Sequence, residues 1–450
     1  MRQPTSCSCP VSVRASARSA TAARIVVVGG GFGGTNLVKA LKGRLPAGAS
    51  LTLVSDESYT CFNPMLPEVV GASIFPEQVV APIRQILRPD ATHRFVMGRV
   101  SRIDLAERWL ECDSLAGAHR IAYDELVLTV GNRARLDLIP GMQQHALPLK
   151  TMGDAMEIRN RVLRRVAQIE LEDDPDKRAA LGSFLVIGGG FSGVEVAGEL
   201  VDCIHSLKRY YPRVQPQELS ITIVQNIDVL LPELPPALGA AARRSLEHRG
   251  VRVLLNAQAT HISAQGVWVK LPGAQLDTLV AGETVISTIG TRANPLIEGC
   301  GLPSERGRIK TGSDFRVQGV GGVWALGDCA LVINQRDRKP SPPTAQFAVR
   351  QARVCARNLL AHLAGRPLQE FSYRTRGTMA SVGRRRGVAQ VFGVHLAGLP
   401  AWLLWRAYYL LQMPTLGRKV RIFVEWTWGM FFPNDITHLR FTRSHELDGD

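Results

Sequence analysis

Two glycine-rich loops have the residue types and spacing best suited to chemistry in this chain, and both are suited to holding phosphate groups. The first, Gly29 to Gly34, places glycines at 29, 31 and 34 in a G-x-G-x-x-G spacing. Glycine there permits a tight turn, close backbone approach to a pyrophosphate and close packing of a helix on a strand. The second loop, Gly188 to Gly193, begins with the same Gly-Gly-Gly-Phe and has glycines at 188, 190 and 193. We expect both to bind dinucleotides, because free amides at a helix start attract phosphate oxygens.

The segments around the first loop have the order that a dinucleotide site requires. Residues 24–28 are a β-branched run typical of a buried strand, residues 35–45 carry apolar side chains on one helix face, and residues 51–54 predict a second strand. An acid at the end of that strand would bind the ribose hydroxyls. Asp56 is the nearest acid, one place later than the simplest register. The alternative for a single such loop is an ordinary structural turn.

The second loop has the same surroundings, with strands predicted at residues 183–187 and 219–224. Gln225 stands where the second unit would carry its acid. Duplication of a structural βαβ unit without a ligand is the alternative to a second nucleotide site. Later in the chain, Asp328 follows an apolar strand and Gly327. From there it could reach a cofactor or simply cap a helix.

The remaining segments alternate between strand and helix, which predicts an α/β fold. Residues 95–104 and 109–112 predict paired strands, and residues 123–132 a strand that returns to a glycine turn. Further segments are expected to be helical at 151–169 and 240–248 and extended at 251–255 and 285–292. A chain of 450 residues predicts two or three domains.

Composition excludes several classes of protein. Lys and Arg outnumber Asp and Glu by 54 to 39, a net charge of +15 that suits an anionic membrane surface, nucleic acid or acidic small molecules. Nucleic acid is disfavoured, because neither zinc-finger spacing nor an aromatic RNA-binding signature accompanies the charge. The eight cysteines are scattered without C-x-x-C, which argues against a disulfide framework and a dithiol redox centre. No metal site is expected, since the chain lacks H-E-x-x-H and clustered cysteine and histidine.

These motifs resemble the two-dinucleotide-binding-domain flavoproteins, and most closely the type II NADH dehydrogenases, which are NADH:quinone oxidoreductases that pump no protons. The resemblance covers roughly residues 24–360. Besides the two loops, it rests on these stretches: residues 62–66, 147–151, 288–295, 325–328 and 342–346, and Val194 to Leu200.

The resemblance implies a FAD-binding domain, residues 24–150 and 311–373, interrupted by a NAD(P)H-binding domain, residues 151–310. Both would be Rossmann-like. Residues 374–450 would form a C-terminal membrane-associating or interface segment, and residues 1–23 a disordered or organelle-targeting tail. FAD would be bound by Gly29, Gly31, Phe32, Gly33, Gly34, Asp56, Val100, Gly131, Gly327 and Asp328. The nicotinamide nucleotide would be bound by Gly188, Gly190, Gly193, Gln225 and Gly290.

The resemblance also implies the reaction: hydride passes from NADH to the flavin, and two electrons then pass to a quinone. Glu195 would lie where the nicotinamide, flavin and quinone meet; the alternative is an acid that simply favours a helix start. Gln346 and Gln351 would line the quinone pocket, or else be ordinary polar residues on a helix face. Arg350 departs from relatives that often carry another glutamine there.

Gln225 is a second departure, since relatives usually carry an acid at this position. An acid there repels the 2′-phosphate of NADPH, and glutamine lowers that repulsion. We expect NADH, with NADPH as an open alternative.

The last part of the chain is predicted to meet a membrane. A helix from Ala401 to Gln412 would be too short to cross a bilayer. Four aromatic residues in it favour the lipid headgroup zone, and three basic residues follow: Trp402, Trp405, Tyr408, Tyr409, Arg418, Lys419 and Arg421. The alternatives are packing on the protein and a homodimer interface. The expected location is the cytoplasmic face of a bacterial inner membrane, or an organelle membrane if the tail is a targeting peptide.

Two other functions stay open from the sequence. One is a related flavoprotein with another donor or acceptor, such as a sulfide:quinone or ferredoxin reductase. The sulfide enzymes need paired reactive cysteines, and Cys329 has no evident partner. The other is a redox sensor that binds FAD and NADH with little turnover.

Overall fold

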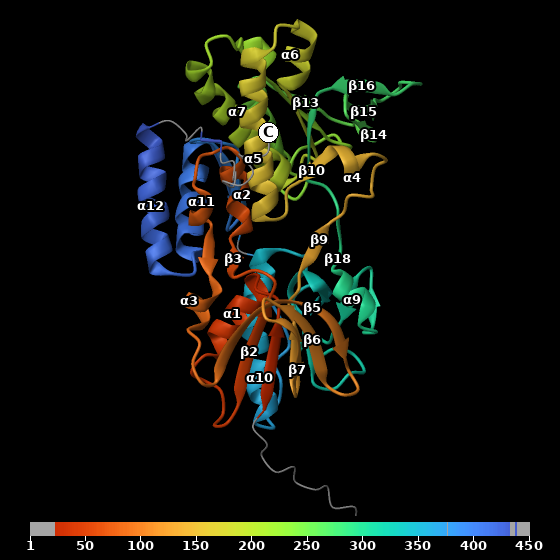
Figure 1. The fold of residues 1–450 in the computed structure, drawn as a ribbon, viewed down its shortest axis with the longest axis vertical. Helices are drawn as coiled ribbons and strands as arrows, with labels where there is room; N and C mark the ends of the chain where they lie inside the picture. The colour runs from red at the N-terminus through yellow and green to blue at the C-terminus, as the bar shows by residue number, and fades with distance from the viewer. Residues whose placement is uncertain (1–22, 376, 433–436, 439–450) are drawn as a thin grey trace, which may run out of the picture.

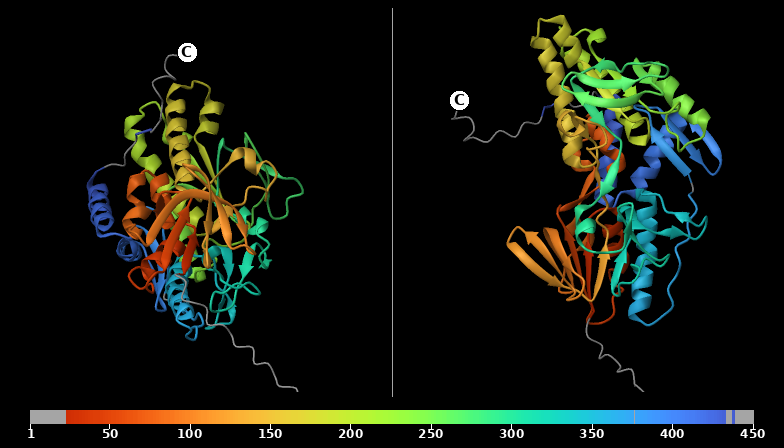
Figure 2. Two further views of the ribbon diagram at one scale, coloured as in Figure 1. Left: turned by 60° about the horizontal axis from the view of Figure 1, so that its bottom comes forward. Right: turned by 90° about the vertical axis from the view of Figure 1, so that its right-hand side faces the viewer.

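A computed structural model describes residues 23–375, 377–432 and 437–438 of the chain. The tail expected at residues 1–23 therefore lies almost entirely outside the described residues. The two halves of the molecule each contain a parallel sheet, one below the other in Figure 1. Two further views show the C-terminal elements beside the second, upper half (Figure 2).

The β-branched run after the tail forms the middle one of the five parallel strands of the first sheet. This strand, β1 (Arg24–Val28), is buried along four of its five residues. The sheet has seven strands in the order β21-β8-β1-β2-β5-β6-β7. Its other members are β21 (Val323–Ala325), β8 (Glu125–Leu128), β2 (Ser50–Ser55), β5 (His93–Asp104), β6 (Trp109–Ser114) and β7 (Gly117–Ala122). β21 to β5 run parallel, and β5, β6 and β7 pair antiparallel, so the strand pair predicted at 95–104 and 109–112 is confirmed.

Helix α1 (Phe32–Leu41) begins and ends earlier than the predicted 35–45. The apolar pattern used for the prediction starts only at Leu37, whereas the glycines at 33 and 34 are already helical and buried. They must be small because the helix start lies against the strand. A Cβ on Gly34 would lie 1.9 Å from the carbonyl oxygen of Gly29. Helix α10 (Ala345–Leu363) packs beside α1.

The second sheet is entirely parallel, in the order β10-β17-β11-β12-β13. Its strands are β10 (Ala146–Pro148), β17 (Thr284–Ser287), β11 (Ser183–Ile187), β12 (Ser220–Val224) and β13 (Val251–Leu254). The main helices of this half are α5 (Met152–Leu171), α7 (Phe191–Leu207) and α8 (Pro236–Glu247). A small antiparallel sheet lies beside them: β14 (Gln258–Ser263), β15 (Gly266–Lys270) and β16 (Thr278–Ala281).

The predicted repeat is visible in the backbone hydrogen bonds. The amide of Gly29 donates to Val54 at 2.8 Å, and the amide of Gly188 donates to Val224 at 2.9 Å. A threonine hydroxyl closes each loop in the same way, from Thr129 to the carbonyl of Val28 and from Thr288 to that of Ile187, both at 2.8 Å. The two loops are therefore the same βαβ turn built twice.

The chain crosses between the halves on two short strands that pair with each other. β9 (Asn132–Ala134) and β18 (Thr291–Ala293) are antiparallel neighbours and run side by side between the halves in Figure 1. Thus β10 lies in the second sheet, although the expected boundary was residue 150. β20 (Arg308–Lys310) contributes Ile309 to the hydrophobic core of the first half, although the boundary was placed at 310. Pairing between segments so far apart leaves no local signal in the sequence.

The C-terminal segment is packed into the second half. It comprises β25 (Gly377–Ser381), β26 (Gly387–Val391), β27 (Val394–Ala397), α11 (Leu399–Gln412) and α12 (Leu416–Phe431). Ala380, Val388 and Trp405 share one hydrophobic cluster with Val186 and Leu200 of the second half. Within the described residues, no helix has the length and apolar character needed to cross a membrane.

The expectation that Trp402 and Trp405 lie in the lipid headgroup zone is wrong. Their exposed fractions are 2% and 1%, because α11 turns this face toward the protein. Helix α12 was not predicted at all, and it is the outermost element on its side of the molecule in Figure 1. The sequence could not tell the inward face of α11 from the outward one, since both are apolar.

Candidate active site

A cavity of about 1260 Å³ lies between the two halves and the C-terminal segment. Its wall is formed by residues of the first glycine loop, the start of α7, the start of α10 and the C-terminal turns of α11. Those from the predicted site are Gly31, Phe32, Gly33, Gly131, Glu195, Gly327, Asp328 and Gln346. One cavity thus joins residues predicted to hold a cofactor with residues predicted to act on a quinone.

The first loop fits a bound pyrophosphate. A Cβ added to Gly31 would meet no atom within 4 Å, so the backbone faces open space there. Gly29 has a φ of 112°, which favours glycine, and Gly34 admits no side chain beside it. The first turn of α1 has no side-chain cap, which leaves its amides free for an anion. The residues present therefore fit the phosphates of FAD.

The second loop has the same open backbone, because a Cβ on Gly190 would also meet no atom within 4 Å. Of this loop and its helix, Phe191, Ser192 and Glu195 contribute to the large cavity. The predicted nucleotide residues Gly188, Gly190, Gly193, Gln225 and Gly290 are not part of that wall.

The ends of β2 and β12 are where an acid was expected to bind a ribose, and backbone hydrogen bonds show which residues occupy these positions. Because Gly29 bonds to Val54 and Gly188 to Val224, the next residues, Ser55 and Gln225, are equivalent positions. Asp56 then corresponds to Asn226, and its carboxylate pairs with Arg133 at 3.2 Å. Asp56 and Val100 are both absent from the cavity wall.

The side chain of Gln225 is bound at both ends by the protein. Its Oε1 accepts from the amide of Gly189 at 2.9 Å, and its Nε2 donates to the carbonyl of Val229 at 3.1 Å. Gln225 is buried beneath the second loop. It therefore brings no charge to the place where a ribose would bind.

Asp328 lines the cavity at the carboxyl end of β21, on the short helical turn Gly327–Cys329. No helix follows immediately, so the alternative of a helix cap is wrong. Burial raises the pKa of Asp328, and the charges of Lys150 and Arg308 oppose that rise. Burial lowers the pKa of Lys150, which also lines the cavity. Asp328 and Lys150 thus bring opposite charges to the same cavity wall.

Gln351 does not line the cavity as expected. Its side chain is 1% exposed, and its Oε1 accepts from the amide of Gly327 at 2.8 Å. It fixes the turn that presents Asp328. Gln346 and Arg350, by contrast, both lie in the cavity wall near the start of α10. Of the two glutamines predicted to line the quinone pocket, Gln346 therefore lies in the cavity wall, whereas Gln351 points into the protein.

Aromatic side chains form the part of the wall next to α11. Phe62 makes edge contacts with Phe32 at 5.4 Å and with Tyr409 at 5.5 Å between ring centroids. All three line the cavity together with Tyr408. A flat, apolar ring system would find aromatic faces and edges on this side.

Glu195 is a buried acid in the wall of this cavity. It lies in the second turn of α7, is 7% exposed, and accepts a hydrogen bond from the backbone amide of Ser381 at 3.1 Å. Burial raises the pKa of Glu195 to about 8, although the Ser381 amide opposes the rise. The charge of Glu68 adds to the increase. The carboxyl is therefore protonated at neutral pH and can donate a proton.

Two further buried acids near Glu195 were missed from the sequence. Glu68 lies in α2 (Leu66–Val70), and Glu199 lies one turn after Glu195 on α7. Arg406 of α11 is the nearest cation, with its Nη2 at 4.0 Å from Glu68 Oε1. One indication in the sequence that Glu68 is unusual is that it is a charged residue within the mostly apolar segment 59–71.

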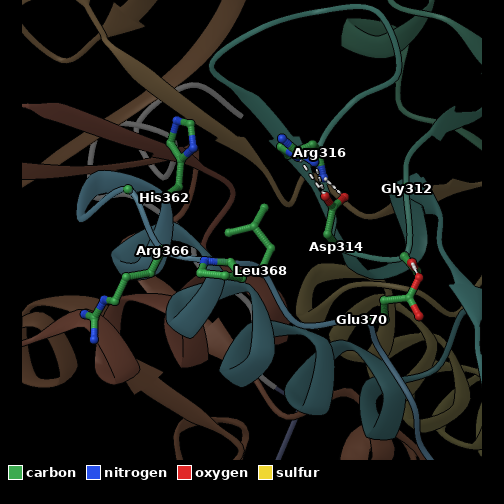
Figure 3. A pocket seen from close by; sticks show the side chains of 10 residues that line it. Gly312, Asp314, Arg316, His362, Arg366, Leu368 and Glu370 are labelled. Atoms are coloured by element: carbon green, nitrogen blue, oxygen red, sulfur yellow. Dashed lines mark hydrogen bonds and ion pairs between the residues drawn. The ribbon is translucent and has the colours of Figure 1, made fainter.

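A second pocket, of about 520 Å³, lies on the first half near the end of α10 (Figure 3). Its charged side chains are largely satisfied by one another. Asp314 pairs with Arg316 at 2.6 Å, and Glu370 accepts from Ser313 at 2.9 Å. Figure 3 shows His362 and Arg366 well apart from that pair. This pocket has no glycine loop and no connection to the predicted site residues.

Neither a metal centre nor a reactive cysteine pair is found among the residues described. They contain no group of three or more metal-ligating side chains. Their cysteines are all free thiols, and burial raises the pKa of Cys329 to about 11. A thiol with so high a pKa is a poor nucleophile, so Cys329 gives no support to sulfide chemistry.

Comparison with known proteins agrees with the geometry. Residues 23–352 match the family model described as pyridine nucleotide-disulphide oxidoreductase. Two Mycobacterium tuberculosis proteins, type II NADH:quinone oxidoreductases Ndh and NdhA, are 29% and 30% identical to this chain. The matches cover 90% and 91% of this chain and 87% of each relative. The type II NADH:quinone oxidoreductase of Staphylococcus aureus is 30% identical, over 84% of this chain and 92% of the relative.

Among solved structures, NDH2 from Plasmodium falciparum in complex with NADH is similar with a TM-score of 0.86. That likeness covers 92% of this chain and 99% of the other at 18% identity, so it demonstrates a shared fold.

Proposed function

The chain belongs to the type II NADH:quinone oxidoreductases of the pyridine nucleotide-disulphide oxidoreductase family, and from this membership we propose its reaction. It is an FAD-dependent enzyme that oxidises NADH and reduces a quinone in the cavity between its halves. The single observation that carries the proposal is this cavity, which joins the open first loop to Glu195 and the aromatic wall of α11. When bound, FAD accepts a hydride from the nicotinamide and passes two electrons to the quinone.

We propose that the first half holds the flavin. The amides of the loop containing Gly29, Gly31, Phe32, Gly33 and Gly34 bind its pyrophosphate, and Gly131, Gly327 and Asp328 border the rest of it. Asp328 and Lys150 supply opposite charges in one wall, which suits a cofactor with hydroxyl and phosphate groups. Asp56 and Val100 act at most through the backbone, since neither side chain lines the cavity.

The second loop, with Gly188, Gly190, Gly193 and Gly290, holds the nicotinamide nucleotide in this proposal. The similar loop geometry and the open space at Gly190 support it. NADH is the donor named for the relatives and is our first choice. The neutral, internally bonded Gln225 removes the repulsion that would exclude a 2′-phosphate, so NADPH is a second donor to test.

Glu195 acts as a proton donor to the quinone. Its carboxyl is protonated at neutral pH, lies in the cavity wall and is held by the Ser381 amide. The reduced quinone gains negative charge as it accepts electrons, so a nearby neutral acid can complete the quinol. Gln346 and Arg350 border the same space from α10.

The C-terminal helices meet the membrane in this proposal. Their outward residues are apolar and exposed: Leu403, Leu411, Leu416, Val420, Phe423, Val424, Trp428 and Phe431. A contiguous apolar surface of this kind marks an interaction site. Lys419 and Arg421 on α12 add charge that anionic lipids attract. The face is on the cytoplasmic side of a bacterial inner membrane, and a homodimer interface is the competing use.

One experiment tests the reaction. The purified protein, supplied with FAD, should be yellow and should oxidise NADH when a water-soluble quinone is added. Glu195→Gln should keep its flavin and its rate with ferricyanide, which needs no proton, while quinone reduction falls. A colourless protein, or a yellow one without quinone turnover, would contradict the proposal.

A further inference from the structure

Helix α7 carries a row of acids that leads away from the cavity. Glu195, Glu199 and Asp202 are spaced at i, i+4 and i+7, so their side chains lie along one face of the helix. At 1.5 Å per residue the row is roughly 10 Å long. Glu195 lines the cavity at one end, and Asp202 is partly exposed at the other. The row therefore joins the reaction site to the protein surface.

Glu68 of α2 faces this row and is held in place by the C-terminal helices. Its Oε2 accepts from the indole nitrogen of Trp426 at 3.2 Å. The hydroxyl of Ser73 donates to Glu199 Oε2 at 2.6 Å, so the segment after α2 also contacts the row. A Cβ on Gly71 would lie 2.7 Å from the Cβ of Glu199, which shows how closely the two helices approach.

Arg406 faces the buried acids at Glu68, and Arg249 faces the row at Asp202. The guanidinium of Arg406 lies 4.0 Å from Glu68 and stacks on Trp402 with its carbon 3.8 Å from the ring centroid. Burial lowers the pKa of Arg406, whereas the charges of Glu68 and Glu199 raise it. The positive charges of Arg384 and Arg385 also lower the pKa of Arg406.

Burial favours the protonated forms of these acids near neutral pH, more strongly for Glu199 than for Glu68. Burial raises the pKa of Glu68 to about 7, and Arg406 and Trp426 oppose that rise. Burial, followed by the charge of Glu68, raises the pKa of Glu199 to about 8. The other titratable neighbours of the row are Cys203, Arg249, Arg159 and Tyr409.

The surface end of the row is open to solvent. Asp202 is 17% exposed, and its carboxylate binds Arg249 at 2.9 Å and the amide of Arg384 at 2.5 Å. Arg384 itself is exposed. A proton taken up at Asp202 needs only to move along one helix face to reach Glu195.

We propose that Asp202, Glu199, Glu68 and Glu195 form a proton-conducting row that supplies the quinone site from solvent, with Arg406 as its charge-balancing group. This inference rests on the proposed function. The overall reaction is NADH + H⁺ + quinone → NAD⁺ + quinol. The hydride brings two electrons and one proton, so one further proton is drawn from water in each turnover. The row delivers that proton, and Glu199 and Glu68 act through Glu195 as positioning residues.

Neutralising single members of the row tests the inference. In Glu199→Gln and Glu68→Gln, the kcat for quinone should fall about tenfold, less than the ~10²–10⁴ typical of a direct proton donor. The rate with ferricyanide should stay unchanged, since that acceptor takes up no proton. The loss should grow as pH rises, because fewer protons then reach Glu195 by other routes. Glu199→Asp, which keeps an acid, should recover most of the rate.

Glu125→Gln is the matched control. Glu125 is also a buried acid, and it accepts from the Trp324 indole nitrogen at 2.6 Å, as Glu68 does from Trp426. It lies on β8 in the first half, away from the cavity wall. This variant should show the wild-type ratio of quinone rate to ferricyanide rate at every pH.

A second readout does not depend on turnover. Infrared titration of the wild-type protein should show protonated buried carboxyls that lose their C=O band above neutral pH. Glu199→Gln and Glu68→Gln should each remove part of that band, and Glu125→Gln should leave the same titration in place.

Two results would overturn the row. One is an unchanged ratio of quinone rate to ferricyanide rate in both variants, and the other is an infrared band that neither variant alters. A wild-type protein without quinone turnover would instead contradict the proposed function, so the two failures are distinguishable.

Discussion

The carboxyl of Glu195 accepts its hydrogen bond from the amide of Ser381, 186 residues further along the chain. This buried acid of the cavity wall is therefore held in position by the C-terminal segment. From the sequence, that segment was expected to meet a membrane, with packing on the protein as one alternative. The structure instead places it in the hydrophobic core of the second half.

Trp405→Ala should destabilise the protein by about 3–5 kcal/mol, because it leaves a large cavity in that core. Urea unfolding followed by circular dichroism measures the change. Trp428→Ala is the matched control, since Trp428 is 59% exposed. It should change the free energy of unfolding by less than about 0.5 kcal/mol. Equal effects of the two substitutions would contradict the packing described for α11.

Stability should fall as pH rises from about 4.5 to about 8. The buried carboxyl of Glu199 has a folded pKa of about 8 against an ordinary 4.5, so the folded state holds a proton that the unfolded state releases. The stabilisation that this bound proton gives the folded state is complete below the unfolded pKa of 4.5. It is lost as the pH rises through the folded pKa of about 8. Glu199→Gln should flatten this part of the curve of unfolding free energy against pH. An unchanged slope would show that Glu199 titrates normally.

Gly31→Ala and Gly190→Ala should separate the two cofactor sites. Neither new methyl group would meet a protein atom within 4 Å, so both proteins should fold. Each methyl would instead occupy space proposed for a pyrophosphate. Gly31→Ala should lose its flavin colour, whereas Gly190→Ala should keep its flavin and show a raised KM for NADH. Flavin absorbance and steady-state rates measure both, and retention of flavin by Gly31→Ala would place FAD elsewhere.

Gln225→Glu should lower the activity of the enzyme with NADPH relative to its activity with NADH. A carboxylate at this strand end repels a 2′-phosphate, and a repulsion of about 1.4 kcal/mol lowers kcat/KM for NADPH roughly tenfold relative to NADH. Glutamate can still accept from the Gly189 amide, although it no longer donates to Val229. Asn226→Asp, one place later, is the control. If Asn226→Asp lowers kcat/KM for NADPH more than Gln225→Glu does, the ribose binds at residue 226 rather than at residue 225.

Lys419→Gln combined with Arg421→Gln should weaken binding to anionic vesicles. Two such charges are worth about 2 kcal/mol, or roughly 30-fold in affinity, at low salt. Vesicle sedimentation measures the change, and added salt should reduce it. Lys270→Gln, an exposed change on β15 of the small sheet, should bind as the wild type does. Loss of a dimer in light scattering, with vesicle binding intact, would assign the face to self-association.

The parts of the fold with strong local patterns were predictable from the sequence. The two glycine loops and the strands entering them are short-range features, and the apolar runs of β1 and β11 admit few other readings. The start of α1 was misplaced because glycines count against a helix unless the close packing at Gly34 is known.

The candidate site was only partly predictable, because burial and partners depend on tertiary contacts. Gln346 and Gln351 look equivalent in sequence, yet one lines the cavity and the other binds Gly327. Glu68 drew no attention because its partners, Arg406 and Trp426, lie more than 300 residues away.

The paired crossing strands β9 and β18 make the first half discontinuous, and this has a consequence for synthesis on the ribosome. The second sheet is complete once β17 has emerged, whereas the first still awaits β21 at residues 323–325. The second sheet can thus form while the first still lacks its edge strand, although the core of the second half also awaits the C-terminal segment. The cavity between the halves, whose wall extends to Lys419, closes only when the chain has been translated as far as that residue.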